Sequence, residues 1–281
     1  MKKTIWSLVA ASALFLAIQH ADAQVKLPAA SSTQTISQGL GIKNIQLTYQ
    51  RPNTYGRPIF GSLVPYNEVW RTGANNIPSI TFEEQVTIES HTVPAGTYGI
   101  FTIPNQNEWT IILSTNVKQW GAYEYKQEED FLRFNVKTQA LTNKVETFTI
   151  AFEDVTTKST AVSLSWENTK VQFAIVADQK KDILASIDEA MKGEKKPYFQ
   201  AAQYYLLNDI DVNKAVEWIE IADQGNTTMP YIKYWKARIL LKAGNKASAI
   251  KAAEQGVDIA QKANNGEYIR LNTQVIEEAK K

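Results

Sequence analysis

Three closely spaced arginines could together recognise an oxyanion such as a carboxylate. Arg51, Arg57 and Arg71 carry planar guanidinium groups, and such groups bind carboxylates through two parallel hydrogen bonds. The same arginines could instead pair with acidic residues of their own domain and fix the chain around them. The sequence leaves both roles open and slightly favours the structural one.

Tryptophans near these arginines and further along the chain offer a second kind of binding group. Trp70 precedes Arg71, and Trp120 lies in the polar stretch WGAYEYKQEED. A flat aromatic ring beside polar groups can bind a sugar ring or an apolar ligand, because it buries a large area at a low entropic cost. Filling a core is the ordinary role of tryptophan, and we predict it for Trp109 and Trp166, which lie in alternating strand patterns.

Most of these side chains belong to one irregular segment, YGRPIFGSLVPYNEVWRTGANN, which runs from Tyr55 to Asn76 and contains three glycines and two prolines. A long irregular segment inside a β-rich domain usually holds side chains in fixed positions. We therefore predict a ligand site here, and a purely architectural loop is the alternative. The candidate ligand-binding residues are Arg51, Tyr55, Arg57, Trp70, Arg71, Asn75, Asn76 and Trp120.

The N-terminus predicts export from the cytoplasm. Two lysines precede an apolar run of 14 residues, 5–18, and the small residues of the sequence ADA follow it. The run is shorter than the roughly 20 residues that span a bilayer, and no cysteine follows it to carry a lipid. We expect residues 1–23 to be a signal peptide cleaved before Gln24, with an uncleaved anchor as the alternative. The mature protein would then be periplasmic or secreted, without an integral membrane anchor.

The mature chain has a balanced charge. Removing residues 1–23 takes two lysines and Asp22 from the 30 basic and 29 acidic residues, which leaves 28 of each. A nucleic-acid partner needs a net basic face, so we predict none. The chain has no cysteine, and its stability must therefore come from burial rather than from disulfides.

Few residue patterns of catalysis or metal binding are present. His91 is the one histidine of the mature chain, so a zinc site lacks its usual ligands. There is no nucleophile elbow, no phosphate-binding glycine loop and no dinucleotide fingerprint. Two carboxylates could still be brought together as an acid–base pair, with Glu68, Glu128, Glu129 and Asp130 as candidates. We assign no catalytic residue, no metal ligand and no cofactor.

The hydrophobic period of the chain changes near Asp178. Before it, alternation such as that of Ile45, Leu47 and Tyr49 indicates strands, and the runs ETFTIAFEDV, TAVSLSWEN and VQFAIVA predict three more in a meander. Eight or nine short strands form an antiparallel β-sandwich over residues 30–177. After it, a helical period predicts about six helices over residues 178–281.

The helical half repeats with a period of 34 residues. The matching pairs are Leu206 and Leu240, Ala215 and Ala249, Ile219 and Ala253, and Ala222 and Gly256. This period is that of tetratricopeptide arrays, although two amphipathic helix pairs can also match by chance. We expect a tetratricopeptide-like domain that offers a surface to a protein partner.

Four motifs of the β half point to a known protein family. They are RPNTYGRPIFGSLVPYNEVWRTGAN from Arg51, VPAGTYGIFTIP from Val93, EWTIILS from Glu108 and WGAYEYKQEEDFLRF from Trp120. In these motifs the chain resembles the secreted Bacteroidetes family known as domain of unknown function 2911. The resemblance implies an exported β-sandwich-like domain, often followed by a helical extension, and it implies no particular reaction.

These observations predict an α+β protein of two domains, an antiparallel β-sandwich followed by an all-α helical-repeat domain. The predicted function is that of an exported, non-catalytic binding or scaffolding protein, which takes a glycan or a small molecule at the polar loop. A carboxylate-based hydrolase acting on glycans or envelope polymers is the alternative. Acids facing one another across a cleft would favour the hydrolase, and arginines paired with internal acids would favour the scaffold.

Overall fold

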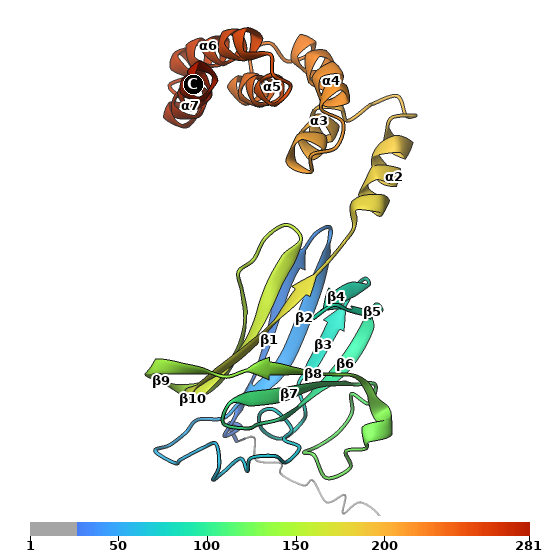
Figure 1. The fold of residues 1–281 in the computed structure, drawn as a ribbon, viewed down its shortest axis with the longest axis vertical. Coiled ribbons are helices and arrows are strands. Elements are labelled where there is room, and N and C mark those ends of the chain that lie inside the picture. The colour runs from blue at the N-terminus through green and yellow to red at the C-terminus, as the bar shows by residue number, and fades with distance from the viewer. Residues whose placement is uncertain (1–26) are drawn as a thin grey trace, which may run out of the picture. The chain divides into compact units, whose positions relative to one another are not determined.

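The computed structural model describes residues 27–281, which form two compact units (Figure 1). The first, here called the β unit, ends at Asp178, and the second, the helical unit, runs from Gln179 to Lys281. Strands in the first and helices in the second confirm the predicted α+β fold of two parts. The predicted signal peptide lies outside the described residues.

Two antiparallel sheets make up the β unit. The six-stranded sheet has the order β1 (Ser32–Leu40), β2 (Lys43–Arg51), β3 (Ser79–Phe82), β6 (Gly96–Ile103), β7 (Glu108–Ser114) and β8 (Asp130–Lys137), with the 3₁₀ helix η1 (Gln127–Glu129) before β8. The four-stranded sheet has the order β5 (His91–Val93), β4 (Val86–Ile88), β10 (Ser159–Val176) and β9 (Gln139–Glu153).

One hydrophobic core contains residues of both sheets. Ile45, Leu47 and Tyr49 of β2 are buried, as their alternation predicted, and they share this core with Leu164 and Trp166 of β10. The Tyr49 hydroxyl also donates a hydrogen bond to a backbone carbonyl of β9 in the other sheet. Because side chains on one face of each strand are removed from water together, this packing is what the two-residue period encodes.

The last part of the β unit differs from the predicted meander. The runs TAVSLSWEN and VQFAIVA belong to one long strand, β10, rather than to two. Its pairing with β9 shifts register on both sides of Glu167, which adopts φ 54°. A bulge of this kind absorbs extra residues without ending the strand. The extra residues at this irregularity lie in β9, whereas the polar link Thr169–Lys170 continues β10 and pairs with Ala140 and Gln139. The described β unit therefore has ten strands.

Two loops cover the outer face of the six-stranded sheet. We call residues 52–78 the first loop and residues 115–129 the second loop. Phe101 of β6 and Ile112 of β7 are fully buried in a small cluster with Val69 of the first loop and Tyr125 of the second. A Cβ atom on Gly99 would lie 2.5 Å from the Ile77 side chain and 2.7 Å from a backbone carbonyl of the second loop. This glycine therefore lets both loops lie against the sheet.

Six helices form the helical unit, in agreement with the sequence. They are α2 (Lys180–Ala190), α3 (Tyr198–Leu207), α4 (Val212–Gln224), α5 (Pro230–Lys242), α6 (Lys246–Lys262) and α7 (Gly266–Lys280). Asp211 caps α4 by accepting hydrogen bonds from two backbone N–H groups of the first turn. Helix α3 packs on α4, and α5 packs on both α6 and α7. The repeated positions Ala215 and Ala249 are fully buried, which brings paired helices close together.

A buried ion network joins α4 to α5. The Asp223 carboxylate lies 2.7 Å from the Lys233 ammonium and 2.9 Å from that of Lys236, which also reaches Glu220. Only 9% of the Asp223 side chain and 8% of the Lys233 side chain are exposed. Burial by itself would raise the pKa of Asp223, but the hydrogen bonds from both lysines outweigh it and lower that pKa.

Candidate functional site

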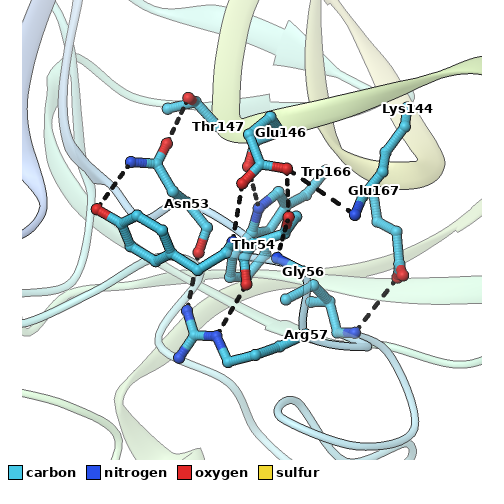
Figure 2. A network of polar contacts seen from close by, with 11 residues as sticks. Asn53, Thr54, Gly56, Arg57, Lys144, Glu146, Thr147, Trp166 and Glu167 are labelled. Atoms are coloured by element: carbon cyan, nitrogen blue, oxygen red, sulfur yellow. Dashed lines mark hydrogen bonds and ion pairs between the residues drawn. The ribbon is translucent and has the colours of Figure 1, made fainter.

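Glu146 of β9 holds the start of the first loop against the β unit (Figure 2). Its carboxylate accepts hydrogen bonds from the Thr54 hydroxyl and, at 2.8 Å, from the backbone N–H of Tyr55. Its backbone carbonyl accepts from the backbone N–H of Thr54 at 2.9 Å and from the indole N–H of Trp166 at 3.2 Å. The hydrogen bonds from Thr54 and Tyr55 lower the pKa of Glu146.

Arg57 closes the turn that Glu146 anchors. Its guanidinium donates to the carbonyl of Thr54 at 2.9 Å and to that of Asn53 at 2.8 Å, and Figure 2 shows both contacts. Tyr55, at φ 48°, brings its ring to 5.8 Å from the same guanidinium. The two carbonyls orient the guanidinium but carry no charge. No carboxylate among the described residues forms an ion pair with Arg57, so its positive charge is not neutralised.

The end of the first loop is pinned to β6. Trp70 and Thr102 exchange two backbone hydrogen bonds, of 2.7 and 3.0 Å. Thr72 adopts φ 56°, which is rare for a β-branched residue, and its hydroxyl is buried 3.1 Å from that of Thr102. Arg71 lies between Trp70 and Thr72, and its guanidinium donates a long hydrogen bond, of 3.4 Å, to the carbonyl of Gly73. No ion pair is formed by Arg71 within residues 27–281.

Trp70 is part of a cluster of aromatic rings rather than a free ligand platform. It stacks on Trp166 with 5.9 Å between ring centroids and 12° between planes. The edges of Phe60, Trp109 and Phe148 contact it at 5.3–6.1 Å. Trp109 and Trp166 are 1% and 2% exposed, so their predicted core role is confirmed. Trp70 packs against the core and also lines the cavity described below.

The second loop pairs with the end of the first. Ile77 donates a backbone hydrogen bond to Gln119 at 3.1 Å, and Gly121 donates one to Asn75 at 2.8 Å. This pairing holds Trp120 at the surface, where 62% of it is exposed. Trp120 stacks on Tyr123 with centroids 5.9 Å apart, and the Arg71 guanidinium lies 5.9 Å from the Trp120 ring.

A cavity of about 580 Å³ lies between these groups. The predicted residues that line it are Tyr55, Arg57, Trp70 and Arg71, and Tyr123 and Trp166 line it as well. We call it the first cavity. Its described lining contains two arginines and no aspartate or glutamate. It therefore presents positive charge beside aromatic surface.

The other predicted residues lie elsewhere. Asn76 and Trp120 line a second cavity of about 530 Å³. The Arg51 guanidinium binds the carbonyl of Phe148 and the hydroxyl of Thr149, so it ties β2 to β9 and has a structural role. The predicted pairing of the arginines with internal acids is wrong for the described residues, because their guanidinium groups donate to carbonyl and hydroxyl oxygens.

The candidate acids do not face one another across either cavity. Glu68 is exposed, and Glu129 accepts a hydrogen bond from the Gln119 amide. Asp130 is held by the Tyr125 hydroxyl at 2.9 Å and by Arg133 at 2.8 Å. Burial and the hydrogen bond to Asp130 raise the pKa of Tyr125 to about 12. This group braces the second loop against β8.

Residues 27–281 contain no group of three or more histidines, cysteines or carboxylates arranged to hold a metal ion. None of the helices in the same part of the chain is both long and apolar enough to cross a lipid bilayer.

Sequence patterns did not single out Tyr123 or Glu146. Tyr123 lies two residues beyond Gly121 in the motif WGAYEY, and this glycine is the local signal, because a Cβ atom there would lie 2.7 Å from the Tyr123 ring. Glu146 lies in a strand-like run, and nothing near it in the sequence indicates its contact with Thr54, 92 residues away.

Comparison with known proteins assigns the chain to a family. No curated protein and no solved structure gave a significant match to the chain. A family model described as protein of unknown function (DUF2911) matches residues 31–175, which include all ten strands except the final residue of β10. The matched region thus contains both loops and nearly all the lining of the two cavities. The chain belongs to the DUF2911 family.

Proposed function

We propose that the β unit binds a small molecule carrying a carboxylate in the first cavity. The observation that supports this most is that Arg57 and Arg71 line one cavity whose described walls contain no acid. A guanidinium beside a carboxylate forms charge-assisted hydrogen bonds, each worth about 1.5–3 kcal/mol. An anionic ligand would supply the negative charge that no side chain in the described lining provides.

The aromatic walls would supply the rest of the binding free energy. Trp70 and Trp166 form a fixed floor, since both pack in the ring cluster, and the Tyr123 ring is 79% exposed. A cavity of about 580 Å³ is within the range of small-molecule sites. Apolar area and two cations together favour an organic acid over an inorganic anion.

Binding without catalysis is favoured over hydrolysis by a carboxylate pair. A glycoside hydrolase of that type needs two acidic side chains on opposite sides of the scissile bond. The described lining of the first cavity offers none, and that of the second cavity offers none either. We propose a non-catalytic role for the same reason.

Replacing Arg71 by glutamine tests this proposal. Wild-type protein is screened by thermal shift against acids and their neutral analogues, such as galacturonate with galactose and succinate with succinamide. We expect acids alone to raise the melting temperature, because they bind the native state. Calorimetric titration of the best acid should give a dissociation constant raised about 10- to 100-fold in Arg71→Gln, equivalent to about 1.4–2.7 kcal/mol.

The matched control is Arg270→Gln, which removes an equal charge from an exposed position of α7 in the helical unit. It should bind like wild type. Arg71→Gln without ligand should keep the wild-type melting temperature within about 2 °C, because the half-buried Arg71 side chain makes a single long hydrogen bond and no ion pair in the described chain, so that its loss should cost about 0.5 kcal/mol. Equal shifts from acids and neutral analogues, or wild-type affinity in Arg71→Gln, would contradict the proposal.

We also propose that the protein is exported and that its helical unit contacts a protein partner. The two lysines, the apolar run and the ADA sequence support export. The buried small residues at the 34-residue spacing support a repeat-like scaffold. Intact-mass analysis of protein recovered from outside the cytoplasm should find a chain that begins at Gln24. A chain retaining residues 1–23 there would contradict cleavage.

A further inference from the structure

Trp120 and Tyr123 expose a broad aromatic surface at the rim of the first cavity. They are 62% and 79% exposed, and their planes are inclined by only 22°. Two neighbouring exposed rings offer a flat apolar surface on which a ligand can stack. Because Tyr123 lines the first cavity and Trp120 lines the second, the pair lies between the two.

Hydrogen bonds to the first loop hold the backbone that carries this pair of rings. Trp120 lies between two backbone hydrogen bonds to the first loop, made at Gln119 and Gly121. Gly121 adopts φ 78° and has no Cβ, so the Tyr123 ring can approach its backbone closely. A ring fixed by its backbone loses little entropy when a ligand stacks on it, which favours a preformed binding surface.

The second cavity has the groups that recognise hydroxyls. It is lined by Thr33, Thr48, Gln50, Lys118 and Gln119, beside the Trp120 ring. Gln119 is only 4% exposed and gives its amide N–H to Glu129, while its side-chain oxygen has no hydrogen-bond partner in the described chain. A buried oxygen without a partner is costly, so a rotation of the Gln119 side chain that turns this oxygen toward a ligand hydroxyl would be favourable.

We infer that the ligand is an oligosaccharide bearing a carboxylate, bound from the first cavity across Trp120 into the second. This inference rests on the proposed function, because the acidic unit takes the arginines of the first cavity. A sugar ring combines an apolar C–H face, which packs on an indole, with hydroxyls at its edge, which suit amide and threonine partners. A small aromatic acid would fill the first cavity and leave the second unused.

Two changes test the inference together: the length of the oligosaccharide is varied, and Trp120 is replaced by alanine. A printed array of acidic and neutral oligosaccharides selects the probe, and galacturonate oligomers of one to four units are titrated if uronates bind. Wild-type affinity should rise about tenfold or more from monomer to trimer, and the trimer should bind Trp120→Ala about as weakly as the monomer does. Monomer affinity should fall much less than trimer affinity, because both arginines remain and Arg71 loses only its contact with the Trp120 ring.

Gly121→Ala gives a second variant that keeps both rings but displaces Tyr123, and it should also reduce the dependence on length. Acid binding that is lost in Arg71→Gln but independent of length and of Trp120 would overturn the inference and leave the proposed function standing. Equal binding of neutral and acidic oligomers would overturn both. If no carboxylated glycan on the array binds, the inference is overturned. The thermal-shift screen with small organic acids would then be the remaining test of the proposed function.

Discussion

Replacing Trp166 with alanine should lower the unfolding free energy of the β unit by about 3–5 kcal/mol. Trp166 is 2% exposed and stacks on Trp70, while the edges of Phe148 and Phe60 contact it at 5.7 and 6.3 Å. Alanine would leave a cavity inside the ring cluster. It would also remove the indole N–H bond to the backbone of Glu146, whose carboxylate holds the first loop.

Denaturant unfolding followed by near-ultraviolet circular dichroism measures this loss. Trp120→Ala is the matched control, since the same side chain is removed from a position that is 62% exposed. It should change the unfolding free energy by about 0.5 kcal/mol or less. Equal losses of unfolding free energy in the two variants would show that the buried ring cluster stabilises the β unit no more than an exposed ring does. Trp166→Phe should lie between them, because it keeps a ring without the N–H donor.

Replacing Asp223 with asparagine should cost the helical unit about 3–5 kcal/mol. The change removes the charge that two lysines share and leaves the Lys233 ammonium buried between α4 and α5 without its carboxylate. Lys236 keeps Glu220 as a partner. An unpaired buried cation is far less favourable than a paired one, so the two helices should separate at a lower denaturant concentration.

The same carboxylate predicts an acid-dependent loss of stability. The pKa of Asp223 is lowered in the folded protein from its ordinary value of 3.8. The stabilisation is therefore present above about pH 3.8 and is lost as pH falls through the lower, folded-state pKa. Circular dichroism at 222 nm, which reports the helices, should show this dependence in wild type and a smaller one in Asp223→Asn.

Glu220→Gln is the control for the ion network, because Glu220 is 42% exposed and exposed pairs contribute about 1 kcal/mol or less. The double variant Asp223→Asn with Lys233→Met should recover part of the loss, since an apolar side chain can replace a buried ion pair at little cost. A double variant no more stable than Asp223→Asn would argue that the unpaired lysine is not the cause.

The sequence predicts the layers of the fold well, because each element carries its own period. The alternation of Ile45, Leu47 and Tyr49 gives the buried face of β2 directly, and the change of period near Asp178 matches the end of the β unit. The continuity of β10 through Thr169 and Lys170 was not predicted, because a polar link within a long strand has the same composition as a turn. Length and polarity alone do not distinguish the two.

The candidate site was predicted only in part, because its geometry depends on contacts distant in sequence. The segment from Tyr55 to Asn76 was identified from its composition, and four of its candidates line one cavity. Arg51 is close to this segment in sequence, yet its side chain faces β9. It lies at the end of β2, from which it points across to the other sheet. No local pattern reports which of three neighbouring arginines turns toward a cavity.

The covering of the outer sheet face limits how this scaffold can be engineered. In many sandwiches the connecting segments extend beyond the strands and can be exchanged for others of different length. Here the two loops shield Phe101 and Ile112 through Val69 and Tyr125, and grafting foreign segments would uncover these side chains. New specificity is better sought by changing single rim side chains, such as those of Trp120 and Tyr123, which support little of the interior.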